Sequence, residues 1–202
     1  MSEDQLQALD GRPMTKSEFA SLPADLDEIQ TRARDGEQFE FLFFWGHQPS
    51  KNDTITKSCL SQWYAAPFVV DGLVYPTAEH WMMAEKARLF GDSAAVDAIL
   101  AAADPKAAKT LGRKVKNFDG QLWAVRCREI VTRGNVEKFR QHEPLRDFLL
   151  ASSGSVIVEA SPYDRIWGIG LKHSDEQALG PTKWRGANPL GFALMDVRSA
   201  LM

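Results

Sequence analysis

The segment Phe68–Tyr75 constrains the fold most, because in it two short apolar runs flank the pair Asp71-Gly72. This pair adopts the positive φ angles of a type I′ turn at low cost, so the segment predicts a β-hairpin. Pro76 ends the second strand, and the threonine that follows it is a typical helix N-cap residue. We therefore expect the hairpin to lead directly into a helix over Thr77–Phe90, which stops at Gly91.

The rest of the chain alternates helical patterns with short apolar runs. Phe39–Trp45 is an aromatic run typical of a buried strand, and Val156–Glu159 predicts a second short strand. Helical patterns cover about residues 92–103, 105–111, 119–133 and 143–150, with Gly112, Gly134 and Gly154 as stops, and Asn188-Pro189 opens a last helix. This order predicts an α+β fold, a helix-rich single domain with a small sheet.

The chain divides into an N-terminal extension over residues 1–36, partly mobile or packed on the domain, and one domain over residues 37–202. A net charge of −3 does not drive the whole chain onto nucleic acid or anionic lipid, although a local basic patch is compatible with it. No apolar run approaches the length of a membrane span, and the first residues are polar. We therefore expect no membrane association and a cytoplasmic location.

Glu79 falls in the first turn of the helix that begins at Thr77, where the helix dipole favours a carboxylate. This position alone indicates a helix-stabilising residue more often than a catalytic one. Lys86 shares its face two turns further on, ~10 Å along the axis, and helical side chains lean toward the N-terminus. Glu79 and Lys86 can thus face one cleft, although a solvated lysine is the simpler interpretation of Lys86.

The loop Ser161–Gly170 follows the predicted strand Val156–Glu159 and contains a second carboxylate, Asp164. Trp167 offers a face for stacking, and Gly168 lets the backbone approach a ligand closely. A tight structural turn, in which Asp164 accepts its own backbone N–H groups, is an equal alternative. The glycines do not match a GxGxxG pattern, so the loop predicts no dinucleotide-binding fold.

The remaining candidates are a cation and two indoles. Arg113 follows a helix end and suits bidentate phosphate contacts, although most such residues are ordinary surface charges. Trp63 and Trp123 favour packing when each is considered alone. The histidines and cysteines lack metal-ligand spacing, and no GxSxG, HExxH or P-loop motif occurs. We expect no metal and no cofactor, which leaves carboxylate chemistry as the main catalytic option.

A set of short motifs occurs in order along the chain. They are Ser61-Gln62-Trp63, Pro67-Phe68, Val70-Asp71-Gly72, Tyr75-Pro76-Thr77-Ala78-Glu79-His80, Lys86-Ala87, Leu111-Gly112-Arg113, Lys138-Phe139, Val158-Glu159-Ala160-Ser161-Pro162 with Asp164, Trp167-Gly168 with Gly170, and Leu190-Gly191 to Met195. On this set the chain resembles the NADAR family, also known as the YbiA-like or riboflavin-biosynthesis-associated N-glycosidase family, from about residue 39 to 201. The resemblance implies a helix-rich α+β domain that hydrolyses N–C1′ bonds of phosphoribosylated or ADP-ribosylated compounds without a metal.

The resemblance also assigns roles to individual residues. It implies that Glu79 and Asp164 are catalytic. The substrate-binding residues that it implies are Gln62, Trp63, Lys86, Arg113, Trp123, Trp167 and Gly168. Many members have Ser-Asn-Phe where this chain has Ser61-Gln62-Trp63, and Gln62 reaches one methylene further than an asparagine.

Three functions remain open at this point. The first is hydrolysis of phosphoribosylamino-pyrimidine intermediates of riboflavin biosynthesis, in which a small phosphorylated N-riboside is the substrate and ribose 5-phosphate is released. The second is removal of ADP-ribose from guanine, for which ADP-ribosylated nucleic acid is the partner. The third is a non-catalytic module that binds ADP-ribose or a nucleotide; the two carboxylates Glu79 and Asp164 argue against it, because a pure binder of anions gains little from them.

Overall fold

The computed structural model describes residues 22–52 and 54–202. Its helices are α2 (Leu26–Arg34), α3 (Ala78–Leu89), α4 (Ser93–Leu100), α5 (Pro105–Gly112), α6 (Gly120–Gln141), α7 (Glu143–Ala151) and α8 (Pro189–Leu201). Its strands are β1 (Phe41–Phe44), β2 (Phe68–Val70), β3 (Leu73–Tyr75) and β4 (Val156–Glu159), and short 3₁₀ helices are η1 (Lys57–Leu60), η2 (Glu176–Leu179) and η3 (Pro181–Lys183). The helix-rich α+β prediction is confirmed.

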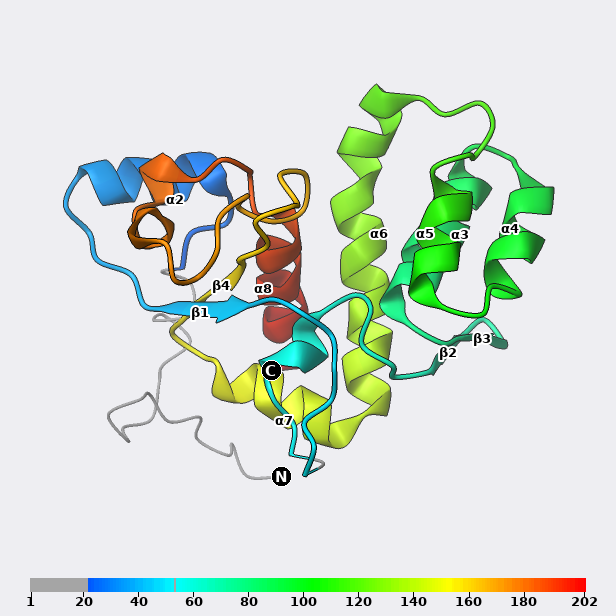
Figure 1. Ribbon diagram of the computed structural model, residues 1–202, viewed down its shortest axis with the longest axis horizontal. Coiled ribbons are helices and arrows are strands. Elements are labelled where there is room, and N and C mark those ends of the chain that lie inside the picture. The colour runs from blue at the N-terminus through cyan, green and yellow to red at the C-terminus, as the bar shows by residue number, and fades with distance from the viewer. Residues whose placement is uncertain (1–21, 53) are drawn as a thin grey trace.

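Helix α6 stands between two halves of the molecule (Figure 1). On one side it packs against α3, which packs in turn against α4 and α5, and we call α3–α5 the helical half. On the other side α6 packs against α8, which also packs against β4. We call β1, β4, α8 and the loops around them the sheet half, so residues from both halves can meet beside α6.

The strands form two separate pairs rather than the single small sheet that was expected. β2 and β3 form the predicted antiparallel hairpin, with φ angles of 50° at Asp71 and 79° at Gly72. β1 and β4 pair in parallel from Phe41–Val156 to Phe44–Glu159. This parallel pair carries Glu159 at its carboxyl end, where the loop Ser161–Gly170 begins soon afterwards.

Helix α3 begins as predicted. The hydroxyl of Thr77 caps it by accepting the N–H of His80, and Gly91 follows its end with a φ of 71°. The predicted stop of α6 at Gly134 is wrong, because α6 continues to Gln141. A Cβ at position 134 would lie 2.1 Å from Cδ1 of Trp81, so this glycine allows the close approach of α3 and α6.

Part of the predicted N-terminal extension is visible in the structure. Residues 1–21 lie outside the described residues, whereas α2 packs against η3 in the sheet half. Ile29 is buried there, and the side-chain amide of Gln30 donates a hydrogen bond of 3.1 Å to the carbonyl of Pro181. Within the described ranges, no helix is long and apolar enough to cross a membrane.

Candidate active site

Glu79 lies in the first turn of α3, but its side chain does not cap the helix. Thr77 caps the N–H of His80, and the N–H of Glu79 itself donates to the carbonyl of Gln62 at 2.9 Å. The Glu79 side chain is only 2% exposed, and its Oε1 has no hydrogen-bond partner. An unpartnered buried carboxylate oxygen costs folding free energy, so a helix-stabilising role does not account for this residue.

The surroundings of Glu79 raise its pKa to about 7. Burial is the largest cause, since it disfavours the charged form, and the negative charge of Asp164 adds to it. Lys109, a hydrogen bond from the Trp63 side chain and the charge of Arg113 act in the opposite direction. A carboxyl group with a pKa near neutrality can exchange a proton under ordinary conditions, which suits general acid–base catalysis.

Asp164 serves both the turn and the site. Its Oδ1 accepts the N–H groups of Ile166 and Trp167, each at 2.8 Å, which is the structural turn that the sequence offered as an alternative. Its Oδ2 lies 4.0 Å from the ammonium of Lys109. One oxygen of Asp164 therefore shapes the loop, while the other faces a cation of the helical half.

Two further residues complete this group, and the sequence interpretation had not selected either of them as a site residue. Glu159 has its pKa raised to about 8, first by burial and then by the charge of Asp164; Lys109 opposes the shift and Glu79 adds to it. Lys109, on α5, also lies 5.8 Å from the ring centroid of Trp63. We call Glu79, Glu159, Asp164 and Lys109 the carboxylate cluster.

Gly168 and Trp167 support the cluster from the loop. A Cβ at position 168 would lie 2.6 Å from the carbonyl oxygen of Glu159, so only glycine fits without a shift of the backbone. Trp167 is half-buried, and its carbonyl accepts the N–H of Leu190 at 3.2 Å. The structure thus brings both residues to the site, where Gly168 makes room for Glu159.

Gln62 faces α6 rather than an open space. Its amide nitrogen donates to Asn135 Oδ1 at 3.1 Å, and its amide oxygen accepts from Asn135 Nδ2 at 3.2 Å. Gln62 contributes to the site through its main-chain carbonyl, which holds the N–H of Glu79. The neighbouring Trp63 contacts the ring of His47, with 5.5 Å between the ring centroids, and bonds to Glu79.

Lys86 and Trp123 belong to a neighbouring cluster near the start of α6. The ammonium of Lys86 donates to the carbonyl of Gly112 at 2.9 Å and lies 4.1 Å from the ring centroid of Phe118 and 5.7 Å from that of Trp123. Burial lowers the pKa of Lys86. Arg113 directly follows Gly112; its side chain is exposed, and its charge acts on Glu79. Lys86 therefore supports the turn that carries Arg113 toward the carboxylate cluster.

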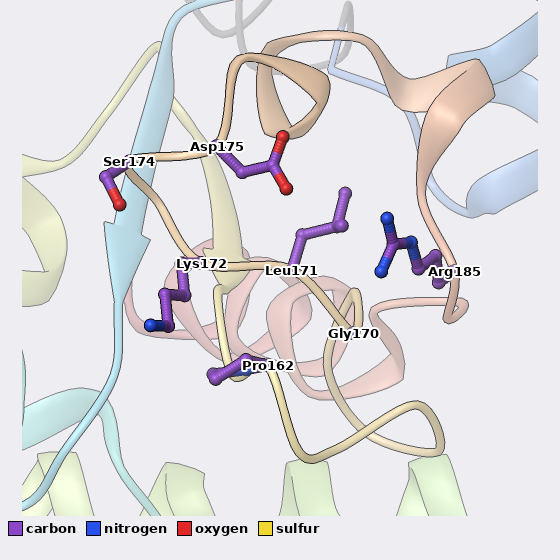
Figure 2. Close-up of a pocket in the computed structure, with 7 residues that line it drawn as sticks. All are labelled: Pro162, Gly170, Leu171, Lys172, Ser174, Asp175 and Arg185. Carbon is purple, nitrogen blue, oxygen red and sulfur yellow. The ribbon is translucent and has the colours of Figure 1, made fainter.

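A pocket of about 370 Å³ adjoins the loop that carries Asp164 (Figure 2). It is lined by Pro162, Gly170, Leu171, Lys172, Ser174, Asp175 and Arg185. The N–H of Gly170 donates to the carbonyl of Asp164 at 3.0 Å, which links the pocket wall to the site. Lys172 and Arg185 supply two cations against one carboxylate, so the pocket can accept an anionic group.

In the part of the chain that the structure describes, no three His, Cys, Asp or Glu side chains are grouped so that they could hold a metal ion.

Comparison with known proteins adds family-level information. A family model described as the NADAR domain matches residues 43–202. N-glycosidase R617 of Acanthamoeba polyphaga mimivirus is 39% identical over 167 residues, which cover 80% of this chain and 96% of that protein. N-glycosidase YbiA of Escherichia coli (strain K12) is 31% identical over 141 residues, which cover 70% of this chain and 79% of that protein.

The fold is also similar to a solved structure. The NMR structure of the E. coli protein YbiA matches with a TM-score of 0.64 at 27% sequence identity. The match covers 89% of this chain and 93% of that one.

Proposed function

Because this chain belongs to the NADAR family, we propose that it is an N-glycosidase that hydrolyses the N–C1′ bond of a phosphorylated N-riboside. The observation that carries the proposal is the Glu79 carboxyl group, which is buried, has an unpartnered oxygen and lies among other charged groups of the cluster. Relatives at 39% and 31% identity are named N-glycosidases, which supports the same reaction class.

The chemistry of the bond explains why a buried carboxylate is useful. Breaking an N-glycosidic bond builds positive charge at C1′, as in other glycoside hydrolyses. The Glu79 carboxylate would stabilise this charge and take a proton from the attacking water. With its pKa raised to about 7, Glu79 is a stronger base than an ordinary carboxylate and is still ionised in a large share of molecules at neutral pH.

Neighbouring residues would bind the rest of the substrate. Asp164 can orient a ribose hydroxyl through Oδ2, which the turn leaves free of backbone partners. The exposed Arg113 suits the phosphate, while Lys86 holds the carbonyl of the residue before it. Trp123 and Trp167 are the proposed stacking surfaces for the base.

The substrate that we propose is a phosphoribosylamino-pyrimidine intermediate of riboflavin biosynthesis, which yields ribose 5-phosphate and a free pyrimidine amine. The family resemblance supports this choice, and so does the net charge of −3, because a small phosphorylated ligand needs only a local basic group. Arg113 near Glu79 meets that need.

A panel of substrates tests this function. The purified protein is incubated separately with the phosphoribosylamino-pyrimidine, with DNA that carries ADP-ribosylated guanine and with NAD, and released ribose 5-phosphate or ADP-ribose is quantified by chromatography. We expect release from the pyrimidine, and a fall in kcat of ~10²–10⁴ in Glu79→Gln, the range typical of a lost general base.

Glu85→Gln is the matched control, because Glu85 lies on the same helix and forms an ion pair with Arg88. It should keep wild-type turnover. Full turnover by Glu79→Gln would refute the assignment of Glu79, and no release from any substrate would refute the N-glycosidase proposal itself.

One observation favours a second candidate, an ADP-ribosyl hydrolase that acts on guanine in nucleic acid. ADP-ribose carries a second phosphate and an adenosine beyond the reacting ribose. The pocket with Lys172 and Arg185 lies next to the loop of Asp164 and provides cations for such a group. Release of ADP-ribose from the DNA alone, lost in Arg185→Ala, would select this candidate over the first.

A further inference from the structure

Glu159 is held in place by its main chain. Its N–H donates to Oδ1 of Asn188 at 3.0 Å, and its carbonyl accepts the N–H of Ile169 at 3.0 Å. The Asn188 amide also donates to the carbonyl of Ile157 at 2.9 Å, so it bridges two residues of β4. These bonds fix the Cα of Glu159 at the end of the strand before any substrate binds.

The side chain of Glu159 occupies a space that the loop leaves open for it. A Cβ at Gly168 would lie 3.3 Å from Cγ of Glu159, tighter than almost all natural contacts of this kind. The Oε2 of Glu159 is buried and has no hydrogen-bond partner, as is true of Oε1 of Glu79. A fixed backbone with an unpartnered carboxyl oxygen is the arrangement of a group that awaits a ligand atom.

Charged groups from three elements face this carboxyl group. They are Glu79 on α3, Asp164 on the loop and Lys109 on α5. Burial and the two carboxylates raise the pKa of Glu159 to about 8, against about 7 for Glu79. Both carboxyl groups thus have raised pKa values, and each can hold or release a proton near neutrality, so one can act as acid and the other as base in a shared site.

We propose that Glu159 is the catalytic acid that protonates the departing nitrogen of the substrate, a role that rests on the proposed N-glycosidase function. Its Oε2 is buried without a hydrogen-bond partner, and the charges of Glu79, Asp164 and Lys109 act on its carboxyl group. Glu79 is already assigned to the attacking water. The Asp164 side chain is 23% exposed and has one oxygen committed to the turn.

The proton balance of the step is complete. Water adds its oxygen to C1′ and gives a proton to the Glu79 carboxylate. The C1′–N bond breaks, its electron pair goes to nitrogen, and the nitrogen takes the proton of Glu159. The products are the free sugar phosphate and the free amine, and transfer of a proton from Glu79 back to Glu159 restores the enzyme.

Substrates with different leaving groups separate this role from a structural one. An amine leaves poorly unless it is protonated, whereas a 4-nitrophenolate leaves without help. Glu159→Gln should therefore lose ~10²–10⁴ in kcat on the phosphoribosylamino-pyrimidine but less than about tenfold on a 4-nitrophenyl riboside 5-phosphate. Glu79→Gln should lose activity on both substrates, since both require an activated water.

The wild-type protein provides a test that needs no variant. Its kcat on the amine substrate should fall at alkaline pH as Glu159 loses its proton, and this alkaline limb should be absent with the nitrophenyl substrate. Glu40→Gln, which changes an exposed carboxylate next to β1, is the control and should leave both profiles unchanged. Melting curves verify that each variant is folded.

The outcomes separate the two proposals. No turnover of any N-riboside by the wild-type protein would overturn the N-glycosidase function and with it the acid role. Wild-type turnover with equal losses on both substrates in Glu159→Gln would overturn the acid role alone. So would a carbon-13 carboxyl titration in which Glu159 ionises near pH 4.

Discussion

Lys138 and Glu79 show two ways of burying a charged side chain in one small domain. They are 0% and 2% exposed. The ammonium of Lys138 donates to the carbonyls of Cys59 at 2.7 Å and Ser61 at 3.0 Å, whereas Oε1 of Glu79 has no partner. Both residues hold the same segment, because Glu79 binds the carbonyl of Gln62 through its N–H.

This difference in hydrogen bonding distinguishes a buried charge that stabilises the fold from one that is available for function. Burial is the largest cause of the shift in both groups: the pKa of Lys138 is lowered to about 8 and that of Glu79 is raised to about 7. Hydrogen bonds to backbone carbonyls offset the cost of burying Lys138, so it can be explained as part of the fold. The cost of burying Glu79 is offset only in part, by the Trp63 hydrogen bond and the charges of Lys109 and Arg113, and its Oε1 lacks a partner that a substrate could supply.

The largest effect on stability should come from Lys138→Met, which keeps the apolar stem but removes the ammonium donor from the carbonyls of Cys59 and Ser61, of which Ser61 retains the N–H of Tyr64. We expect a loss of about 3 kcal/mol in the free energy of unfolding, because hydrogen bonds to charged groups are worth about 1.5–3 kcal/mol each. Urea unfolding measures it. Lys114→Met, at an exposed lysine, should change stability by less than about 0.5 kcal/mol. A stable Lys138→Met protein with an altered KM would place Lys138 in the site and break the comparison.

A smaller loss should follow from Asn135→Ala, which leaves the buried amide of Gln62 without its partner. We expect a destabilisation of about 2 kcal/mol, in the range for an unsatisfied buried polar group. Activity should also decline, because the carbonyl of Gln62 positions the N–H of Glu79. Gln121→Ala, at the exposed first turn of α6, is the control for urea unfolding and turnover.

The free energy of unfolding should depend on pH through the two buried carboxyl groups of the cluster, Glu79 and Glu159. Glu79 and Glu159 have pKa values raised from 4.5 to about 7 and about 8 in the folded protein. The stability linked to them is fully present below pH 4.5 and is lost as the pH rises through 7 and 8. Glu159→Gln removes one such group, so it should be more stable than the wild type at pH 9.

Measurement at pH 4 is the internal control, because the difference in stability between Glu159→Gln and the wild type should vanish at that pH. Thermal unfolding at the two pH values measures both differences. A variant that is less stable than the wild type at pH 9 would mean that Glu159 is ionised and satisfied in the folded protein, as Lys138 is.

The smallest effect should come from Trp63→Phe, which removes the hydrogen bond that the Trp63 side chain gives to Glu79. As the proposed base, Glu79 must be ionised, so kcat should fall at acid pH as Glu79 gains a proton. Because the Trp63 bond lowers the pKa of Glu79, its loss should move this acid limb to higher pH by less than about one unit. Trp45→Phe, at a half-exposed tryptophan, should leave the limb in place. A downward shift would contradict the assignment of this limb to Glu79.

Local signals in the sequence predicted the local structure well. Asp71-Gly72 identified the hairpin because the turn needs positive φ angles at both positions, and Thr77 identified the start of α3 because its hydroxyl caps the helix. Gly134 misled the prediction of α6, since its role depends on Trp81, a residue of another helix. A glycine that ends a helix and one that allows close helix packing look the same in a sequence.

The site was predicted only in part, for the same reason. Glu79 and Asp164 stand out in a helix start and in a polar loop, where the family motifs also occur. Glu159 ends a strand of apolar residues, and Lys109 lies on a helix with other exposed lysine residues nearby. Glu159 belongs to the same motif as Asp164, but its burial and the charges of Glu79 and Lys109, 80 and 50 residues away, have no local signal. Lys109 acts on carboxyl groups that lie 30 to 55 residues away along the chain.

The parallel pairing of β1 with β4 sets the order in which the protein can be assembled during synthesis. The pair β1–β4 can form only after Glu159, the partner of Phe44, has been synthesised, more than 100 residues later. The helical half, with Glu79 and Lys109, consists of contacts that are close along the chain and can form while the ribosome is still at work. Glu159, the proposed acid, lies in the last quarter of the chain, so under the proposed mechanism a nascent chain that ends before it should lack activity.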